Sequence, residues 1–291
     1  MRLTKRWRVQ RMTASGVVRE RADVLAGEEP LEIRLHGTPF TITMRTPGND
    51  VDLVAGFLVS EGVVRAEDDI AWIDHRAGIG ATGERDYNVV DVRLAPGVSL
   101  PDISLQRHVY TSSSCGVCGT ASIEAVRKVS AYDVTADDVE VRLDHLLALP
   151  DRLRERQEVF GRTGGVHAAA LFLPAATGDE QGTGEPRLAC VREDVGRHNA
   201  VDKVVGWALR EGLLPLRGAV LQVSGRASFE LVQKAAMAGV PVLSAVSAPS
   251  ALAVELAQEL GLTVVAFNRG ETLNAYTHVH RLRAVATTTG R

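Results

Sequence analysis

Two cysteines separated by two residues are the side chains of this sequence best suited to chemistry. Cys115 and Cys118 lie in the segment Ser112–Gly119, between a run of serines and a glycine. The residues before the segment are typical of a strand end, and the apolar spacing over 121–129 predicts a helix after it. The cysteines are therefore expected on a loop that leads into a helix N-terminus.

A thiol at such a position loses its proton more easily, because free N–H groups and the helix dipole stabilise an anion. The thiolate is the reactive species. Three functional interpretations of Cys-x-x-Cys stay open: half of a zinc site, a redox dithiol, or a persulfide carrier whose second cysteine assists release. Burial as structural thiols is less favoured, because glycines and serines flank the pair.

His167 is a second candidate, since it follows a glycine-rich turn and precedes an apolar strand. Zinc-dependent nucleoside deaminases carry His-x-Glu at such a position, with Pro-Cys-x-x-Cys later in the chain. Here Ala168 and Ala169 follow the histidine, and the cysteine pair precedes it. This argues against deaminase chemistry and leaves a similar scaffold open. A role in the turn and a functional role for His167 both remain open, whereas Cys190, inside an apolar strand, is expected in the core.

Further polar residues crowd the turns after the predicted strands. They are either solvated helix starts or parts of a ligand site. The turn Ser224–Ser228 could present backbone N–H groups and the guanidinium of Arg226 to a phosphate. The segment Phe267–Thr272 could hold a nucleobase, although a plain turn would look similar. The first such turn and its helix contain Asp194, Arg197, His198, Asn199, Asp202 and Lys203.

The composition limits the functions that these residues can have. The chain has 291 residues, 45% of them hydrophobic, which predicts a buried core in one large domain or two smaller ones. The net charge of −3 gives no support for nucleic-acid or anionic-membrane binding. No apolar run has membrane-spanning length, and the basic start lacks the apolar core of a signal peptide. Three cysteines make a disulfide framework unexpected, so we expect a cytoplasmic protein.

Two kinds of region should position the candidate residues. Residues 7–45 predict β structure, with Leu31, Ile33 and Leu35 alternating before a turn at 36–39, and Phe40, Ile42 and Met44 alternating after it. Asn49 can cap a following helix that ends at Gly62. A strand is expected over 89–94, and the likeliest domain boundary is 96–101.

The second region alternates strands and helices. Residues 143–160 should be largely helical, with a break or new start at Pro150, and 177–187 should form an exposed loop. Alternation implies a largely parallel sheet with ligands at the carboxyl ends of its strands. The expected strands cover 168–173, 188–191, 218–223, 240–245 and 262–267, and the expected helices cover 200–209, 229–238 and 251–260.

Taken together, these segments resemble the FdhD family, the accessory proteins of formate dehydrogenases. Several separate segments in order are more specific than the cysteine pair alone. The resemblance spans most of the chain and is carried by Ser112–Gly119, Thr163–Ala169, Arg192–Lys203, Ser224–Lys234, Ala248–Ala257 and Phe267–Tyr276.

The resemblance implies a sulfur carrier with an α/β fold. Its fold would be a cytidine-deaminase-like three-layer core over 101–291, with a smaller N-terminal α+β subdomain over 1–100. Cys115 would take sulfur as a persulfide from a cysteine desulfurase, and Cys118 would resolve or protect the intermediate. The sulfur would pass to Mo-bis(molybdopterin guanine dinucleotide) before this cofactor enters formate dehydrogenase.

The resemblance also implies a site for the guanine dinucleotide, for which GDP would be a fragment mimic. Spacing and charge add Arg226 and Arg197 as candidates for the pyrophosphate. A homodimer is expected, with no intrinsic metal. Two alternatives remain: a cofactor-binding chaperone without sulfur transfer, and a zinc-dependent deaminase-like enzyme. The implied guanine site consists of Phe267, Asn268, Arg269, Gly270, Glu271 and Thr272.

Overall fold

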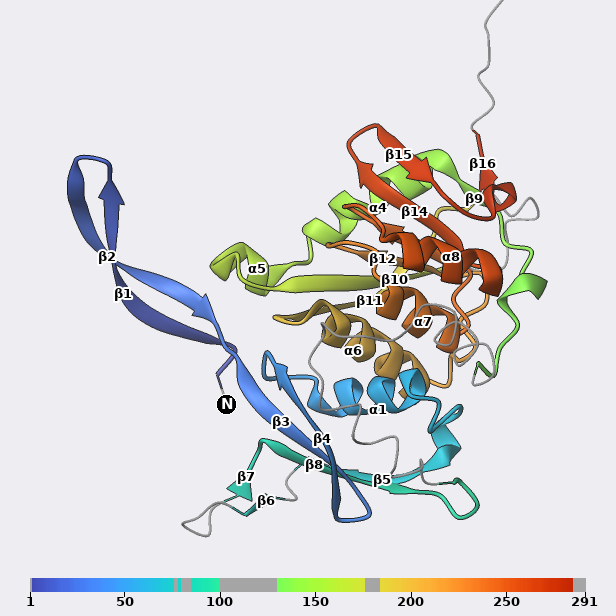
Figure 1. Ribbon diagram of the computed structural model, residues 1–291, viewed down its shortest axis with the longest axis horizontal. Coiled ribbons are helices and arrows are strands. Elements are labelled where there is room, and N and C mark those ends of the chain that lie inside the picture. Colours follow the sequence, from blue (N-terminus) through green and yellow to red (C-terminus); the bar gives the residue numbers. More distant parts are fainter. Residues whose placement is uncertain (1, 76–77, 80–84, 100–129, 176–183, 285–291) are drawn as a thin grey trace, which may run out of the picture.

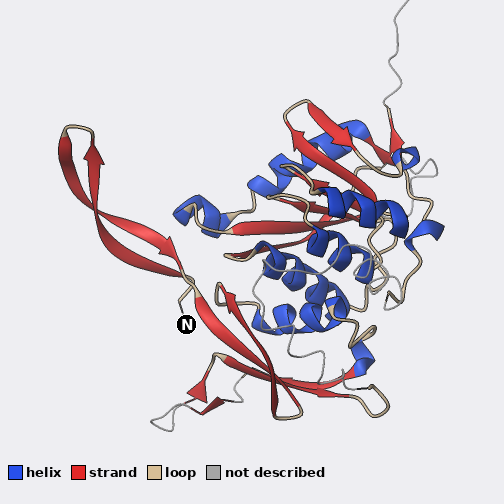
Figure 2. Cartoon of the chain, in the orientation of Figure 1, coloured by secondary structure: helices blue, strands red, loops and turns tan. Residues whose placement is uncertain are grey.

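The computed structural model describes residues 2–75, 78–79, 85–99, 130–175 and 184–284. The cysteine segment 112–119 and the helix expected over 121–129 lie outside these described residues. Figures 1 and 2 show a long two-stranded ribbon that extends from a layered body of sheets and helices. The prediction of a mixed α/β chain is confirmed.

The ribbon consists of β1 (Thr4–Thr13) and β2 (Gly16–Ala26), which pair antiparallel. Gly16 has a φ of 118°, which suits the turn between the strands because glycine alone adopts it freely. Most side chains of both strands are exposed. The β structure predicted over 7–45 is confirmed and begins a few residues earlier.

A four-stranded sheet with the order β4-β3-β8-β5 follows the ribbon. The predicted hairpin turn at 36–39 and the strand over 89–94 are both present. A short strand pair, β6 and β7, lies between β5 and β8 in the chain. The bounds are β3 (Glu29–Leu35), β4 (Thr38–Arg45), β5 (Ile70–Asp74), β6 (Gly78–Ile79), β7 (Arg85–Asp86) and β8 (Val89–Leu94).

Phe40 changes which side chains of β4 face the core. Successive residues of β3 pair with Thr41 and Pro39, so Phe40 is an extra residue on β4. A bulge of this kind shifts the alternation of the strand by one residue. Ile42 and Met44 are therefore exposed while Phe40 is buried, although the alternation in the sequence placed all three on one face.

Helix α1 (Asp50–Ser60) begins after Asn49, the residue expected to cap it. Asn49 has a φ of 56°, and its side chain makes no capping hydrogen bond. Asp50 instead anchors the helix start, because its carboxylate lies 3.1 Å from the Arg45 guanidinium and 2.9 Å from His75 Nε2. Burial raises the pKa of Asp50, but these two partners outweigh it and leave the pKa below its ordinary value.

A six-stranded sheet with the order β11-β10-β12-β13-β14-β15 forms the rest of the scaffold. Among the described strands, β12, β13 and β14 pair in parallel, whereas β10, β11 and β15 join antiparallel. The prediction of a largely parallel sheet is therefore wrong at both flanks. There β11 follows β10, and β15 follows β14, as antiparallel neighbours. The bounds are β10 (His167–Leu173), β11 (Arg187–Asp194), β12 (Val220–Val223), β13 (Val242–Ala245), β14 (Thr263–Arg269) and β15 (Thr272–Ala275).

Helices cover both faces of this sheet. In β10, Ala168 and Phe172 pack with α4, whereas Ala169 and Leu171 join the core formed with α6, α7 and α8. α6 starts three residues earlier than expected, so the polar turn before it is short. The bounds are α4 (Leu143–Arg154), α5 (Glu158–Thr163), α6 (Arg197–Arg210), α7 (Phe229–Met237) and α8 (Ala251–Leu260).

Short elements complete the described chain. The 3₁₀ helices are Glu67–Asp69, Val134–Ala136 and Val279–Arg281. The strands β9 (Val141–Arg142) and β16 (Leu282–Arg283) pair with each other in parallel.

Helix α1 packs directly on α6 and joins the two sheets into one stack (Figure 1). Gly56 and Gly206 face each other at the crossing, where a Cβ on Gly206 would collide with the Asp52 carbonyl oxygen. The apolar face of the four-stranded sheet, including Ile33 and Val92, covers the other side of α1 in the same core. The described parts of the two regions thus share a core, and a division at residue 100 stays a prediction.

Candidate functional site

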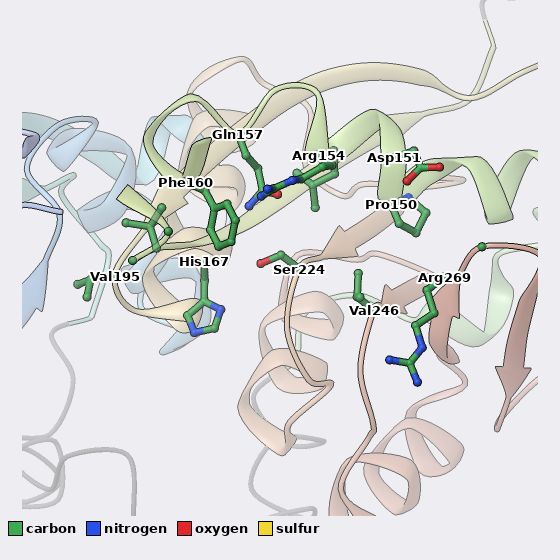
Figure 3. A pocket seen from close by; sticks show the side chains of 15 residues that line it. Pro150, Asp151, Arg154, Gln157, Phe160, His167, Val195, Ser224, Val246 and Arg269 are labelled. Atoms are coloured by element: carbon green, nitrogen blue, oxygen red, sulfur yellow. The ribbon is translucent and has the colours of Figure 1, made fainter. Parts of the chain in front are cut away.

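A cavity of about 610 Å³ lies at the carboxyl edge of the parallel strands. Its floor follows the strand order, with Val195 after β11, His167 at the start of β10, Ser224 after β12, Val246 after β13 and Arg269 at the end of β14. Figure 3 shows these side chains in that sequence below α4 and α5. The prediction that the turns after successive strands meet at one edge is confirmed.

The last turns of α4 and the start of α5 form the opposite wall of the cavity. Arg154 places its guanidinium 4.1 Å from the centre of the Phe160 ring. Glu193 accepts hydrogen bonds of 2.8 Å from the backbone N–H groups of Val159 and Phe160, which fixes the start of α5 against β11. Sequence analysis missed this wall, because nothing in residues 150–160 marks them as close to the sheet edge.

Pro150 lies inside α4 and does not break it, contrary to the prediction. Proline has no N–H to donate to the carbonyl four residues earlier, which belongs to Leu146. The side chain of Asn268 supplies this bond, because its Nδ2 donates to the Leu146 oxygen at 2.8 Å and to Ser244 Oγ at 2.9 Å. Asn268 is fully buried, so the structure gives it a role in holding α4 on the sheet.

Phe267 and Asn268 form a bulge near the end of β14. Ala266 pairs with Asn274, whereas Arg269 pairs with Thr272, so two residues of β14 remain unmatched. Phe267 has a φ of 51°, an uncommon conformation for a bulky residue. The bulge turns the Asn268 side chain toward α4, while the Phe267 ring packs partly on the opposite core. Arg269 and Gly270 line the cavity, and Phe267 does not.

His167 lies on the cavity floor between Val195 and Ser224. Its ring lies beside Gly225, where an added Cβ would be 3.5 Å from Nδ1. Burial lowers the pKa of His167, and repulsion from Arg197 and His198 lowers it further. The imidazole is therefore neutral at pH 7 and offers one donor and one acceptor nitrogen.

The starts of α6 and α7 meet beside this floor. His198 Nε2 lies 3.4 Å from Ser228 Oγ and 3.6 Å from a Glu230 carboxylate oxygen. The contact with His198 lowers the pKa of Glu230 to about 2. The Nε atom of Arg197 is buried without a hydrogen-bond partner among the described residues. Arg197 is half-buried and Arg226 is exposed, and neither lines the cavity.

The other polar residues at the start of α6 face the N-terminal sheet and form a clamp, by which we mean Asp194, Asn199 and Lys203 with Thr46. Lys203 Nζ lies 2.7 Å from the Asp194 carboxylate and donates to the Thr46 oxygen at 2.8 Å. Asp194 also accepts from the Thr46 N–H, and Asn199 donates to the Met44 oxygen. These residues are neither a solvated helix start nor part of the cavity wall.

Two further buried ion pairs reinforce this contact. Asp202 accepts from Ser60 of α1 at 2.7 Å and from Lys234 of α7 at 2.8 Å. Asp52 of α1 pairs with Arg192 of β11 at 2.9 Å. Charged residues over 192–203 therefore hold the four-stranded sheet and α1 against the six-stranded sheet.

A model of the FdhD/NarQ family matches residues 26–283. The chain belongs to the FdhD/NarQ family. The chain is 58% identical over 289 residues to a protein of Streptomyces avermitilis, with 98% of each chain covered. It is 55% identical over 278 residues to one of Mycobacterium tuberculosis, covering 94% of this chain and 97% of the relative. Both relatives bear the name sulfur carrier protein FdhD, which confirms the predicted family and its carrier role.

A solved structure shares the fold of this FdhD/NarQ chain. It is described as a putative formate dehydrogenase accessory protein from Desulfotalea psychrophila and aligns with a TM-score of 0.71. The sequences are 22% identical, and the alignment covers 97% of this chain and all of the other. A likeness to cytidine deaminases is not tested by this match and stays a prediction.

The structure places the predicted site residues of this family member in different surroundings. Cys115 and Cys118 lie outside the described residues. Cys190 is buried as expected, and burial raises the pKa of its thiol to about 12. Glu271 and Thr272 are exposed beyond the cavity, so a nucleotide role for the segment 267–272 stays a prediction.

The described residues contain no group of three or more His, Cys, Asp or Glu side chains placed to hold a metal ion. Within the same ranges, no helix combines the length and apolar character that crossing a membrane requires.

Proposed function

We propose that this chain carries sulfur as a persulfide on Cys115 and delivers it to Mo-bis(molybdopterin guanine dinucleotide). The near full-length similarity to relatives named sulfur carrier protein FdhD carries the proposal. The cysteine inventory supports it, since the chain has three cysteines and Cys190 is buried with its pKa raised to about 12. Cys115 and Cys118 are thus the thiols left for exchange at neutral pH.

Loading is a thiol exchange that needs no external oxidant. The Cys115 thiolate attacks the outer sulfur of a persulfide on a cysteine desulfurase. One S–S bond forms on Cys115 as the donor's S–S bond breaks, and the desulfurase leaves as a thiolate. Cytoplasmic reducing conditions suit this step, because both thiols must start reduced.

Delivery uses the second cysteine. The Cys118 thiolate attacks the inner sulfur of the Cys115 persulfide, forms a disulfide and releases hydrosulfide to the molybdenum of the bound substrate. The two cysteines are oxidised together by two electrons, and a cellular dithiol reductant resets them. Soft sulfur ligands suit the metal.

The cavity is our candidate for one guanine dinucleotide end of this substrate. Its volume of about 610 Å³ lies within the usual range of small-molecule sites. Arg154 and Arg269 supply cationic groups for the pyrophosphate, and the neutral His167 offers hydrogen bonds to the base or ribose. The loaded cofactor would then pass to formate dehydrogenase, with the carrier working as a homodimer.

Intact mass spectrometry after incubation with a desulfurase and cysteine tests the proposal. The wild-type chain should gain one sulfur, and Cys115→Ala should gain none and fail to mature formate dehydrogenase. Cys118→Ala is the matched control, which should load sulfur and deliver it poorly. If Cys115→Ala still supports full dehydrogenase activity, the chain acts instead as a chaperone that binds the cofactor without sulfur transfer.

A further inference from the structure

Gln157 lies in the short link between α4 and α5 and lines the cavity. Only 8% of its surface is exposed. Its backbone is satisfied locally, because its N–H donates to the Arg154 oxygen at 3.2 Å and its oxygen accepts from the Gly161 N–H at 2.9 Å. Its carboxamide makes no hydrogen bond with any described residue. A buried amide without a partner is costly, so this group is open to whatever fills the cavity.

Flat side chains lie close to Gln157 at the same end of the cavity. Figure 3 shows Phe160 and His167 there, one on the α5 wall and the other on the floor. The Arg154 guanidinium lies over the Phe160 ring, and Glu193 accepts from the Phe160 N–H, so the ring has a fixed place. Aromatic rings and guanidinium planes are the surfaces on which nucleobases stack. This end of the cavity therefore suits a flat heterocyclic base.

The other end of the cavity carries a guanidinium. Arg269 lies there, at the end of β14, whereas His167 lies at the start of β10 (Figure 3). The strands β12 and β13 separate β10 from β14 in the sheet, so strand spacings of about 4.8 Å place the two ends roughly 14 Å apart. A phosphate prefers the arginine end, because a guanidinium donates charge-assisted hydrogen bonds to it. The two ends thus differ in the part of a nucleotide that each can hold.

We propose that Gln157 hydrogen-bonds the edge of a guanine base at the α5 end of the cavity, with the phosphates of the ligand toward Arg269. The inference rests on the proposed cofactor site, to which it adds the residue that recognises the base and the direction of the ligand. Guanine carries an acceptor, O6, next to a donor, N1–H. The amide matches both, since its Nε2 donates to O6 and its Oε1 accepts from N1–H. Burial excludes competing water from this pair and so strengthens it.

Calorimetry of the full chain with GDP, N1-methyl-GDP and inorganic pyrophosphate tests the contact. Gln157→Met keeps the length of the side chain and removes both polar atoms, so the GDP dissociation constant should rise about tenfold or more. N1-methyl-GDP lacks the N1–H and should bind the wild type about tenfold more weakly than GDP. In Gln157→Met the two ligands should bind alike, because the group that tells them apart is gone. Pyrophosphate has no base and should bind both forms equally.

The matched control is Gln258→Met, which makes the same chemical change at an exposed position of α8. Helix α8 covers the face of the sheet opposite to α4, so this substitution should leave the GDP affinity unchanged.

Gln157→Glu provides a second variant that keeps a polar group in place. A carboxylate only accepts hydrogen bonds, so it suits the adjacent N1–H and N2–H₂ of guanine and repels N1 of adenine, which is itself an acceptor. The ratio of the ADP to the GDP dissociation constant should therefore rise about tenfold or more over the wild-type ratio. Repulsion between the carboxylate and the phosphates affects both nucleotides alike and cancels in this ratio.

Four results would each overturn the inference: a wild type that binds no GDP, an unchanged GDP affinity in Gln157→Met, an equal loss of GDP and pyrophosphate, or an unchanged ratio in Gln157→Glu. Sulfur loading on Cys115, measured by intact mass on the same samples, should be the same in all variants. A chain that gains no sulfur but binds GDP through Gln157 would contradict the carrier proposal and leave the base contact standing.

Discussion

Polar side chains at the carboxyl edge of the six-stranded sheet fall into two sets with opposite surroundings. In the clamp, Asp194 and Lys203 are buried, and each bonds to Thr46 of the other sheet region. On the cavity wall, His167 and Arg269 face open space, and no hydrogen bond joins their side chains to the described residues. Residues of similar type and sequence position thus either hold the two sheet regions together or line the cavity. The hydrogen-bond partners of each side chain distinguish the two roles.

This comparison predicts separate consequences for the two sets. Removing a clamp residue leaves a buried charge or dipole unpaired, so the stability of the fold should fall. Removing a residue of the cavity wall leaves nothing unpaired, so stability should stay and ligand affinity should fall.

The largest effect is expected for Lys203→Met. The substitution keeps the aliphatic stem and leaves Asp194 buried without its cation, which costs about 3–5 kcal/mol of unfolding free energy. Urea denaturation measures this loss. In Asp194→Asn/Lys203→Met the buried charge is also gone, so part of the stability should return. A loss below about 1 kcal/mol for the single variant would mean that the pair is solvated like a surface ion pair.

Asn268→Ala tests a residue that sequence analysis assigned to the cofactor and the structure places under α4. The Leu146 carbonyl would lose its donor, because Pro150 offers no N–H. The expected cost is about 1–3 kcal/mol of unfolding free energy, measured by urea denaturation.

The matched background for this prediction is Pro150→Ala, which restores a backbone N–H that can donate to Leu146. In that background Asn268→Ala should cost clearly less, and the difference is the coupling energy of the double-mutant cycle. Equal costs in both backgrounds would show that Asn268 does not replace the missing backbone bond.

Much of the scaffold could be predicted from the sequence because local patterns dictate it. Helix α8 has the predicted bounds, and β8 does too, since apolar periodicity and flanking breakers decide such elements. The failures came from tertiary contacts. The bulge at Phe40 depends on pairing with β3, and Pro150 stays helical because a side chain more than a hundred residues away bonds to Leu146.

The sequence predicts which turns surround the candidate site, but not which of their side chains line it. Strand order places the turns after β12 and β14 at one edge, so Ser224 and Arg269 could be expected to meet. The sequence does not show which polar residue of a turn has a partner on another element. Lys203 and Arg197 therefore looked equivalent, although one is fully bonded in the clamp and the other has a buried Nε without a partner.

Arg269→Gln addresses the cavity wall. Arg269 is exposed and makes no hydrogen bond that the fold needs, so the unfolding free energy should change by less than about 0.5 kcal/mol. The affinity for GDP should fall about tenfold, because a charge-assisted contact to phosphate is lost. Calorimetry measures this affinity, with the exposed Arg217→Gln as a control of equal charge. Unchanged GDP affinity would show that the nucleotide site does not lie at the end of β14.

The smallest effect concerns Glu230, which stands between the two sets because it has a partner and is partly exposed. The contact with His198 lowers the pKa of Glu230 from 4.5 to about 2. A carboxyl group with a lowered folded-state pKa adds stability that is present above its unfolded pKa and is lost as pH falls toward the folded value. The window therefore runs from about pH 4.5 down to about pH 2.

Because the Glu230 side chain is 44% exposed, solvent screening keeps the contribution small. Urea denaturation at about pH 5 and about pH 3 should show a smaller acid-induced loss in Glu230→Gln than in the wild type, and His198→Gln should match it because it removes the same ionic contact. If His198→Gln instead retains the wild-type pH dependence, another group holds the Glu230 carboxylate in its charged form.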